Sequence, residues 1–478
     1  MRMEQSKWPT IIQGGMGVAI STWPLARVVS QAGHLGVVSG TGIDTVLVRR
    51  LQDGDPHGHV RRALKASPWP DLAQSVVQRF FRREGRASGQ PYARVPKWSL
   101  DASRPRVSLG MLGGFVEVWL AKIGQPGLVG INLMTKIALP NLAVLYGAIQ
   151  AGVDVVLMGA GIPREIPGVL DSLSQHAPTQ MHLDVVGMPS RDFPWVTFDP
   201  QDFDSVASTT LKRPAFFPII ASHSLATMLS KKANGSIEGF VVEGPMAGGH
   251  NAPPRGPKQF DEAGQPIYGP RDEVDWEELA ALGYPFWMAG GLGTPRGLKY
   301  ALDHHAAGIQ VGSLFAFCRE SGLNPRLKDQ VIQTVRAEHP QVYTDPIGSP
   351  TGFPFKVVQV AHTLSDPSLY AARERICDLG YLREAYRDAA GRIQFRCAAE
   401  PIATYVRKGG SVEDTVGRKC LCNGLMASAG FAQIQRLGEE PGIVTSGDAI
   451  EAMRPLVSRG DGHYSAKEVL DYLIQGSL

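Results

Sequence analysis

Short apolar runs alternate with helical patterns along most of the chain. Eight runs have the pattern of buried strands: TIIQGG, LGVVSG, LVGINLM, VDVVLMGAG, AFFPIIASH, IEGFVVEG, YPFWMAGG and AGIQVGS. Continuous Val, Ile and Leu runs are typical of parallel strands that are covered on both faces. Eight such units predict an α/β fold, a TIM (β/α)8 barrel. An open doubly wound sheet is less favoured, because GGMG follows the first strand in place of a GxGxxG fingerprint.

Three segments interrupt this alternation. Residues 54–127 are rich in Arg, Pro and Gly and form an insertion between strands two and three. The runs MHLDVVG and PWVTFD predict a hairpin-like insertion before the fifth strand. Residues 325–478 contain helical stretches, ARERICDLGYLREAYRDAA and SAKEVLDYLIQG, which predict a helical cap beside the barrel. The barrel itself is then expected from residues 1–53 and 128–324.

Composition and charge exclude some classes of partner. The chain has 48 basic and 45 acidic residues, a net charge of +3, so nothing points to nucleic acid or to an anionic membrane. No run approaches the ~18 apolar residues of a membrane span, and the N-terminus lacks a signal-like apolar region. The five cysteines suit a reducing compartment, so we expect a cytoplasmic protein. Cys420 and Cys422 form a lone CxC without a second pair at zinc-ligand spacing, so we expect no metal.

Glycine and small polar residues close nearly every predicted strand. Single glycines there are ordinary turn residues, but so many suggest a bulky, flat ligand across the barrel mouth. The ends of strands seven and eight are the most specific, because glycine-rich loops before helices cradle phosphate. These ends carry Ala289, Gly290, Gly291, Gly293, Gln310, Val311, Gly312 and Ser313. AGGLGTPRG opens a predicted helix in which Thr294 is the expected N-cap. We therefore expect a phosphate site at these two loops.

A histidine follows the sixth strand, in the stretch EGPMAGGHN. His250 is expected to face the same mouth as the phosphate loops, where it would act as a general base or a hydrogen-bond donor to a bound ring. Gly248 and Gly249 would let the backbone pass close to the ligand. Asn132, at the end of strand three, has an amide suited to the edge of a heterocycle. For His223, at the end of strand five, a supporting role in the site and no role are equally favoured.

The ordered motifs IIQGGMG, LGVVSGTG, GINLM, GAG, VEGPMAGGHN, AGGLG and GIQVGS resemble the nitronate monooxygenase family, formerly the 2-nitropropane dioxygenases. That family also contains FMN-dependent enoyl-ACP reductases. The resemblance covers residues ~9 to 320 in broken form. It implies a TIM barrel that holds FMN noncovalently.

The resemblance also implies roles for single residues. Gly14, Gly15 and Met16 would pack on the flavin, and Asn132 would bond to FMN. The loops after strands seven and eight would hold the FMN phosphate region, and His250 would be the catalytic histidine of the AGGH motif. The protein supplies position and electrostatics, while the flavin carries the redox chemistry.

The substrate stays open between two reactions. The first is oxidation of alkyl nitronates with O2. The second is trans-acting, NAD(P)H-dependent reduction of enoyl thioesters on an acyl carrier protein, because the long insertion and the tail with GRKCLCNGLMASAG resemble the larger subgroup that contains such reductases. A non-catalytic flavin-binding subunit is a third possibility, against which the histidine argues. We expect a homodimer.

Overall fold

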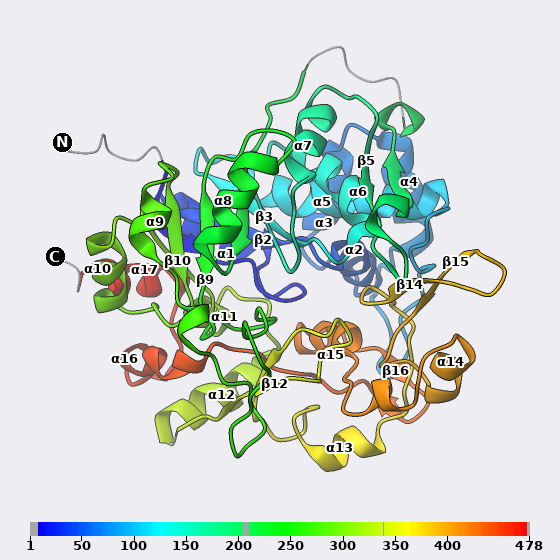
Figure 1. Ribbon diagram of the computed structural model, residues 1–478. Helices are drawn as coiled ribbons and strands as arrows, with labels where there is room; N and C mark the ends of the chain where they lie inside the picture. The colour runs from blue at the N-terminus through cyan, green and yellow to red at the C-terminus, as the bar shows by residue number, and fades with distance from the viewer. Residues whose placement is uncertain (1–7, 204–209, 338, 476–478) are drawn as a thin grey trace.

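The computed structural model describes residues 8–203, 210–337 and 339–475, and its centre is a closed barrel of eight parallel strands (Figure 1). The order around the barrel is β1-β11-β10-β9-β8-β4-β3-β2. The strands are β1 (Ile11–Gln13), β2 (Leu35–Ser39), β3 (Val129–Met134), β4 (Val155–Gly159), β8 (Ala215–Ile220), β9 (Phe240–Glu243), β10 (Phe286–Ala289) and β11 (Gly308–Val311). They coincide with the eight apolar runs, so the predicted TIM barrel is confirmed.

The strand sequences are apolar on both faces because both faces are covered. Alternate residues of each strand point into the barrel, where Val37, Leu157 and Trp287 belong to one fully buried cluster. The ring of Phe217 stacks on Trp287 at a centroid distance of 4.8 Å. The intervening residues, such as Ile11 and Val38, join the larger core beneath the helices. This two-sided burial produces the continuous apolar runs of a parallel sheet.

Helices on the outside of the barrel follow most of its strands. They are α1 (Trp23–Gln31), α2 (Ile43–Gln52), α6 (Ala138–Gln150), α7 (Ile166–Ser174), α8 (His223–Lys232), α9 (Trp276–Ala280), α10 (Pro295–Asp303) and α11 (Ser313–Ala316). The predicted cap of α10 is present: the Thr294 hydroxyl accepts a hydrogen bond of 2.9 Å from the Gly297 N–H, and Pro295 takes the first helical position.

The inserted segment 54–127 contains the helices α3 (His59–Ala66), α4 (Pro70–Phe80) and α5 (Arg104–Lys122). Helix α5 packs against α1, α2 and α6, so it belongs to the outer helical layer of the barrel. Between β4 and β8, β5 (Thr179–His182) pairs antiparallel with β7 (Trp195–Phe198). This is the hairpin expected before the fifth barrel strand. The short β6 (Val185–Val186) lies between them in sequence and pairs elsewhere.

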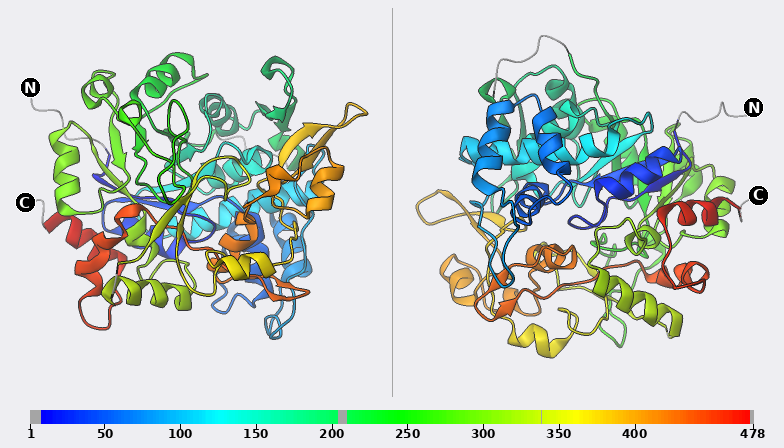
Figure 2. Two further views of the ribbon diagram at one scale, coloured as in Figure 1. Left: turned by 60° about the horizontal axis from the view of Figure 1, so that its bottom comes forward. Right: turned by 180° about the vertical axis from the view of Figure 1, so that it is seen from behind.

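The C-terminal segment is mixed rather than only helical (Figure 2). Its helices are α12 (Pro325–Ala337), α13 (Pro367–Ala372), α14 (Ile402–Arg407), α15 (Leu421–Ser428), α16 (Arg454–Val457) and α17 (Ala466–Gln475). Its strands are β12 (Val342–Asp345), β13 (Phe355–Val358), β14 (Glu384–Arg387), β15 (Ile393–Arg396), β16 (Ile434–Gln435) and β17 (Gly438–Glu439). We call residues 325–475 the extension.

The prediction of one helix in the extension is wrong. Of the stretch ARERICDLGYLREAYRDAA only the first residue, Ala372, belongs to α13, and the second half contains β14, which pairs with β15 and with β6. Gly380, at φ +72°, ends any helical path through this stretch. Ala385 is buried between less buried neighbours, which is the two-residue alternation of a strand. By contrast, SAKEVLDYLIQG forms α17 as expected.

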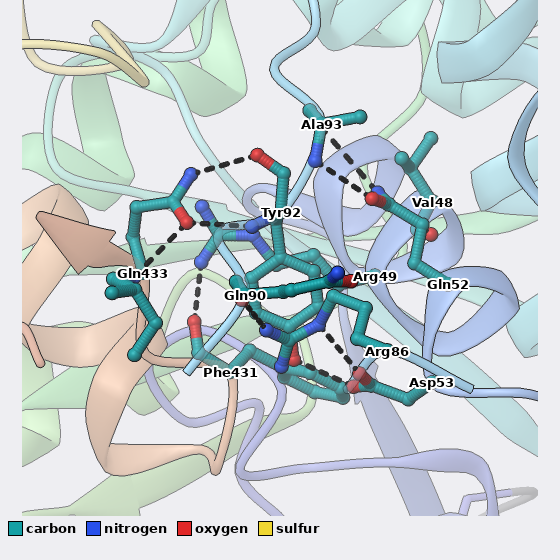
Figure 3. A network of polar contacts seen from close by, with 11 residues as sticks. Val48, Arg49, Gln52, Asp53, Arg86, Gln90, Tyr92, Ala93, Phe431 and Gln433 are labelled. Atoms are coloured by element: carbon teal, nitrogen blue, oxygen red, sulfur yellow. Dashed lines mark hydrogen bonds and ion pairs between the residues drawn. The ribbon is translucent and has the colours of Figure 1, made fainter. Parts of the chain in front are cut away.

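A polar network ties the inserted segment to both the barrel and the extension (Figure 3). The side-chain amide of Gln433 pairs with the backbone of Tyr92 in both directions, at 2.7 and 3.1 Å. The Tyr92 hydroxyl donates to Asp53 at 2.6 Å, and Arg86 pairs with the same carboxylate at 2.9 Å. Arg49 of α2 donates to the carbonyl of Phe431. Three distant stretches of sequence are therefore joined at one place.

A buried carboxylate makes a second junction of the same three parts. Asp44 of α2 is 1% exposed and pairs with Arg106 of α5 at 2.5 Å. The Trp98 indole N–H and the Tyr381 hydroxyl of the extension also donate to it, at 2.9 and 2.5 Å. Burial alone would raise the pKa of Asp44, but Arg106 and these donors hold it below its usual value. Asp44 therefore stays ionised, and its carboxylate holds Arg106, Trp98 and Tyr381 in place.

Replacing this carboxylate should destabilise the whole fold. Asp44→Asn leaves the Arg106 guanidinium buried without its counter-charge, which typically costs about 3–5 kcal/mol. Asp71→Asn, on the exposed face of α4, is the matched control and should change stability by less than about 0.5 kcal/mol. Urea unfolding of the three proteins checks this expectation. Equal midpoints for Asp44→Asn and Asp71→Asn would contradict it.

Candidate active site

The residues expected to form the site all line one cavity at the carboxyl end of the barrel strands. Its volume is about 270 Å³. The walls include every one of the expected residues: Gly14, Gly15, Met16, Asn132, Gly248, Gly249, His250, Ala289, Gly290, Gly291, Gly293, Gln310, Val311, Gly312 and Ser313. Sequence positions 300 residues apart therefore meet at one place, which is the mouth where TIM barrels carry their active sites.

Bare backbone forms much of the wall, and neighbouring atoms explain why. A Cβ on Gly15 would stand 2.2 Å from the Cβ of Asn132. Gly290 and Gly291 have φ of +93° and +77°, and a Cβ on Gly290 would meet the Gly244 carbonyl at 3.0 Å. Gly312 differs, because its φ is −104° and its nearest neighbour would be the Met16 sulfur at 3.6 Å. A side chain at Gly312 therefore fits the backbone and would occupy the cavity.

Gln310 presents an unpaired polar atom at this wall. Its Oε1 is buried and, within the described part of the chain, accepts no hydrogen bond. An acceptor in this condition costs free energy unless a ligand or water donates to it. The cavity therefore has a built-in place for a hydrogen-bond donor.

His250 is held by the extension. Its Nε2 lies 2.7 Å from the Ser349 hydroxyl, which in turn contacts the Thr351 hydroxyl at 2.8 Å. The ring packs edge-on against Phe355 at 4.9 Å, and His250 forms a β-bridge with that residue. Burial, together with the nearby Lys136 ammonium, lowers the pKa of His250 to about 4. The imidazole is therefore neutral at physiological pH, so an imidazolium is not the form that meets a ligand.

Glu243 is the titratable group that the strand pattern did not single out. It ends β9 and lines the cavity beside His250. Burial raises its pKa from 4.5 to about 7. Among the described residues, no cation forms an ion pair with it. The only signal in the sequence was its place at the end of a barrel strand.

A second cavity, of about 220 Å³, adjoins the first. Glu243 and His250 line both cavities, so they stand at the junction. The second cavity also holds Arg255 and Tyr268, and Lys136 lies near His250. Perturbed acid–base groups at a junction of two cavities are typical of an active site.

The extension forms a further part of the first cavity, which the sequence did not predict. Its apolar side chains there are Phe355, Leu382, Leu421, Leu425, Ile443 and Val444. Thr445 accepts a 2.8 Å hydrogen bond from the Gly249 N–H, and Ser313 accepts one of 2.9 Å from the Gly447 N–H. The loop 445–447 thus lies against both the AGGH turn and the loop after β11.

Glycine is required at each of the two positions before His250 for a different reason. A Cβ on Gly248 would stand 2.8 Å from the backbone of Ser446 and Gly447, so the close approach at this residue is made by the extension. Gly249 has a φ of +79°, which only glycine adopts readily, and its side-chain direction is open. Contact of either glycine with a ligand stays a prediction. His223 begins α8, pairs with Glu278 at 3.2 Å and lines neither cavity.

Comparison with known proteins agrees with the motif resemblance. The family model for nitronate monooxygenase matches residues 172–341, which include β8 to β11 and His250. A probable nitronate monooxygenase of Bacillus subtilis (strain 168) is 33% identical over 98 residues, or 20% of this chain and 26% of that protein. The chain thus matches about a quarter of that relative's length. The resemblance inferred from the motifs is confirmed over this span.

Several solved structures are similar over nearly the whole chain. FabK from Thermotoga maritima has a TM-score of 0.47 at 16% identity, covering 98% of this chain and 92% of that one. Nitroalkane oxidase from Streptomyces ansochromogenes has 0.47 at 13%, covering 99% and 96%. The enoyl reductase domain of MlnA from Bacillus amyloliquefaciens has 0.46 at 12%, covering 98% and 93%. Within the described residues, no helix is long and apolar enough to cross a membrane.

The raised pKa of Glu243 predicts a specific dependence of stability on pH. The folded protein keeps this proton between pH 4.5 and about 7, whereas the unfolded chain has lost it, so stability falls as pH rises through this window. The slope from this one group approaches about 1 kcal/mol per pH unit. Glu243→Gln should remove this slope, so the stability of the variant relative to the wild type should increase between about pH 5 and about pH 7.5.

Urea unfolding at several pH values measures this difference. Glu262→Gln, at an exposed position, is the matched control and should follow the wild type at every pH. Parallel pH curves for wild type and Glu243→Gln would show that the Glu243 carboxyl titrates normally.

Proposed function

We propose that this chain, which matches the nitronate monooxygenase family model over residues 172–341, is an FMN-dependent oxidoreductase that oxidises alkyl nitronates. The observation that carries the proposal is the junction of two cavities, with His250 and Glu243 between a glycine-lined wall and a second space that contains Arg255. One cavity would take the cofactor and the other the substrate.

The residues present fit FMN. A flat ring needs bare backbone beside it, which Gly14, Gly15 and Gly290 supply. The orphaned Oε1 of Gln310 and the amide of Asn132 offer hydrogen bonds to a heterocycle edge. The loops after β10 and β11 would hold the phosphate through backbone N–H groups, helped at α10 by the N-terminus of a capped helix. When bound, FMN would supply the redox chemistry.

The protein's own groups would manage charge and protons. A nitronate is an anion, and Arg255, which pairs with Asp272 at 3.9 Å, lines the second cavity, while Lys136 lies near His250. The neutral His250 either donates an N–H to an oxygen anion or accepts a proton, and Ser349 on its Nε2 fixes the ring's orientation. Glu243, with a pKa near 7, exchanges a proton at neutral pH beside it. Phe355 and the other apolar side chains of the extension exclude water from the cavity.

A second candidate is reduction of enoyl thioesters with NAD(P)H, on a substrate carried by an acyl carrier protein. The observation in its favour is the apolar wall that the extension adds, because an acyl chain would pack on Leu421, Leu425 and Ile443. Both reactions use the same flavin, the same histidine and the same junction. The electron donor therefore separates them.

Anaerobic mixing of the purified holoprotein with single reductants decides between the two reactions. Loss of flavin absorbance with propyl-2-nitronate alone supports nitronate oxidation. Loss with NADH or NADPH, and recovery on adding an enoyl thioester, supports the reductase. The cofactor, released by heat and identified by mass, should be FMN. Recovery of FAD, or of no flavin after reconstitution with FMN, would contradict the proposal at its base.

Gly312 provides a test of the phosphate position. Gly312→Asp places a carboxylate in the cavity without backbone strain, so repulsion of the phosphate dianion should reduce FMN affinity by at least ~10-fold, about 1.4 kcal/mol. Gly312→Asn has the same shape without the charge and should retain much more FMN. Flavin occupancy after gel filtration measures the difference. Equal occupancy in the Asp and Asn variants would place the phosphate elsewhere.

His250→Ala should leave FMN bound and lower the turnover rate by ~10²–10⁴, the usual contribution of a positioned acid–base group. The matched control is His223→Ala, which removes a histidine that lines neither cavity. Because the pKa of His250 is about 4 and that of Glu243 about 7, an inflection near neutral pH in kcat/KM belongs to Glu243. It should persist in His250→Ala and disappear in Glu243→Gln. Unchanged kinetics in His250→Ala would show that this histidine has only a structural role in the turn.

A further inference from the structure

Four of the five cysteines meet in the extension. Cys377 follows α13, Cys397 follows β15, and Cys420 and Cys422 flank the first residue of α15. All four line one small cavity, together with apolar neighbours such as Leu379 and Ala399. The fifth, Cys318, lies in the barrel core away from them. The lone CxC of the sequence therefore gains two partners that lie more than 20 residues before it.

The surroundings of the sulfurs are those of bound thiolates. Backbone N–H groups donate to three of them: Ala399 to Cys397, Asn423 to Cys420, and both Tyr381 and Leu382 to Cys422. The side-chain amide of Asn423 adds a 3.6 Å contact to the Cys420 Sγ. Such N–H···S bonds stabilise thiolates and tune metal centres. One contact points the other way, since the Cys420 thiol donates to the Ile376 carbonyl at 3.8 Å, and a thiolate gives that contact up.

Positive charge faces the cluster. Lys97 and Arg383 act on Cys377, and Arg373 acts on Cys420. Two carboxylates lie near, but both have partners of their own: Glu400 pairs with Lys408 at 2.8 Å, and Asp378 accepts from the Asn423 amide at 2.6 Å. Arg373 pairs with Glu440. The unpaired excess of positive charge, from Lys97 and Arg383, suits a centre that is negative overall.

Free thiols explain this arrangement poorly. All four are unbonded to one another, although they share a cavity. Four unbonded sulfurs that line one small cavity, with hydrogen-bond donors and cations around them, indicate a missing centre that binds all four.

The spacing selects the kind of centre. Among residues 8–203, 210–337 and 339–475, no three His, Cys, Asp or Glu side chains are arranged to hold a single metal ion. A zinc ion needs all four sulfurs at about 2.3 Å from one point. A [4Fe–4S] cluster instead binds each cysteine at a separate iron, so its four cysteine sulfurs stand further apart around a common centre. We propose that Cys377, Cys397, Cys420 and Cys422 hold an iron–sulfur cluster.

The cluster site adjoins the candidate flavin cavity. Leu382, Leu421 and Cys422 line both cavities, so one of the four cysteines borders the candidate flavin cavity. Helix α15, which contains Cys422 and begins directly after Cys420, contacts the barrel where the Met426 side chain approaches Gly42. The cluster site follows from the cysteines alone and does not depend on the proposed function.

Anaerobically purified full-length protein tests the proposal through its iron and acid-labile sulfide, each measured per chain. Four irons and four sulfides per chain are expected, the content of a [4Fe–4S] centre. Dithionite should give a fast-relaxing EPR signal at low temperature, distinct from a flavin radical. Zinc in place of iron, no metal after reconstitution with iron and sulfide, or a disulfide among the four would overturn it. FMN content, measured on the same sample, reports separately on the proposed function.

Matched variants assign the ligands. Cys377→Ala, Cys397→Ala and Cys420→Ala should each lose most of the iron and sulfide, whereas Cys318→Ala, the same change in the barrel core, should keep both. Circular dichroism and gel filtration check folding. Iron retained at the wild-type level in a folded Cys397→Ala protein would contradict the assignment. If the ligand variants do not fold, the iron and sulfide content of the wild type still decides.

Discussion

The buried carboxylate of Asp44 is the constraint on which the assembly of the three parts depends. It lies on a barrel helix, its counter-ion comes from the inserted segment, and the Tyr381 hydroxyl comes from the extension. A desolvated charge of this kind is tolerated only when its partners are in place. Tyr381 lines the barrel-mouth cavity, and its backbone N–H and that of Leu382 bond to the Cys422 sulfur. One ion pair therefore fixes both the wall of the candidate active site and the cysteine cluster.

The extension covers part of the barrel mouth and adds a wall to the cavity there. Bare glycine backbone makes one wall, and apolar side chains and the loop 445–447 make the other. Enclosure has an electrostatic result: His250 becomes a neutral imidazole, and Glu243 becomes an acid that titrates near neutrality. Both perturbed groups line the junction of the two cavities. Loss of water is thus what makes them suited to acid–base chemistry.

Much of the barrel could be predicted from the sequence, because strands that are buried on both faces have continuous apolar sequences and end at glycines. The expected site residues follow from the same logic, since the ends of parallel strands share one edge. The extension could not be predicted in this way. Ser349, Phe355 and Thr445 act on His250 and Gly249 through contacts between segments about 100 to 200 residues apart, and no local pattern records them. The four cysteines are also brought together by the fold, so their spacing in the sequence matches no local motif. The strand β14 was not predicted because its stretch has a helical composition.

Hydrogen–deuterium exchange with and without FMN would test most directly that the barrel and the extension form one cofactor site. If they do, FMN should slow exchange in the loops 289–293 and 310–313 and, in the same experiment, in the extension segment 443–449. Protection confined to the barrel loops, with the extension unchanged, would show that the extension covers the mouth without forming the site. Protection in neither region would contradict the account as a whole.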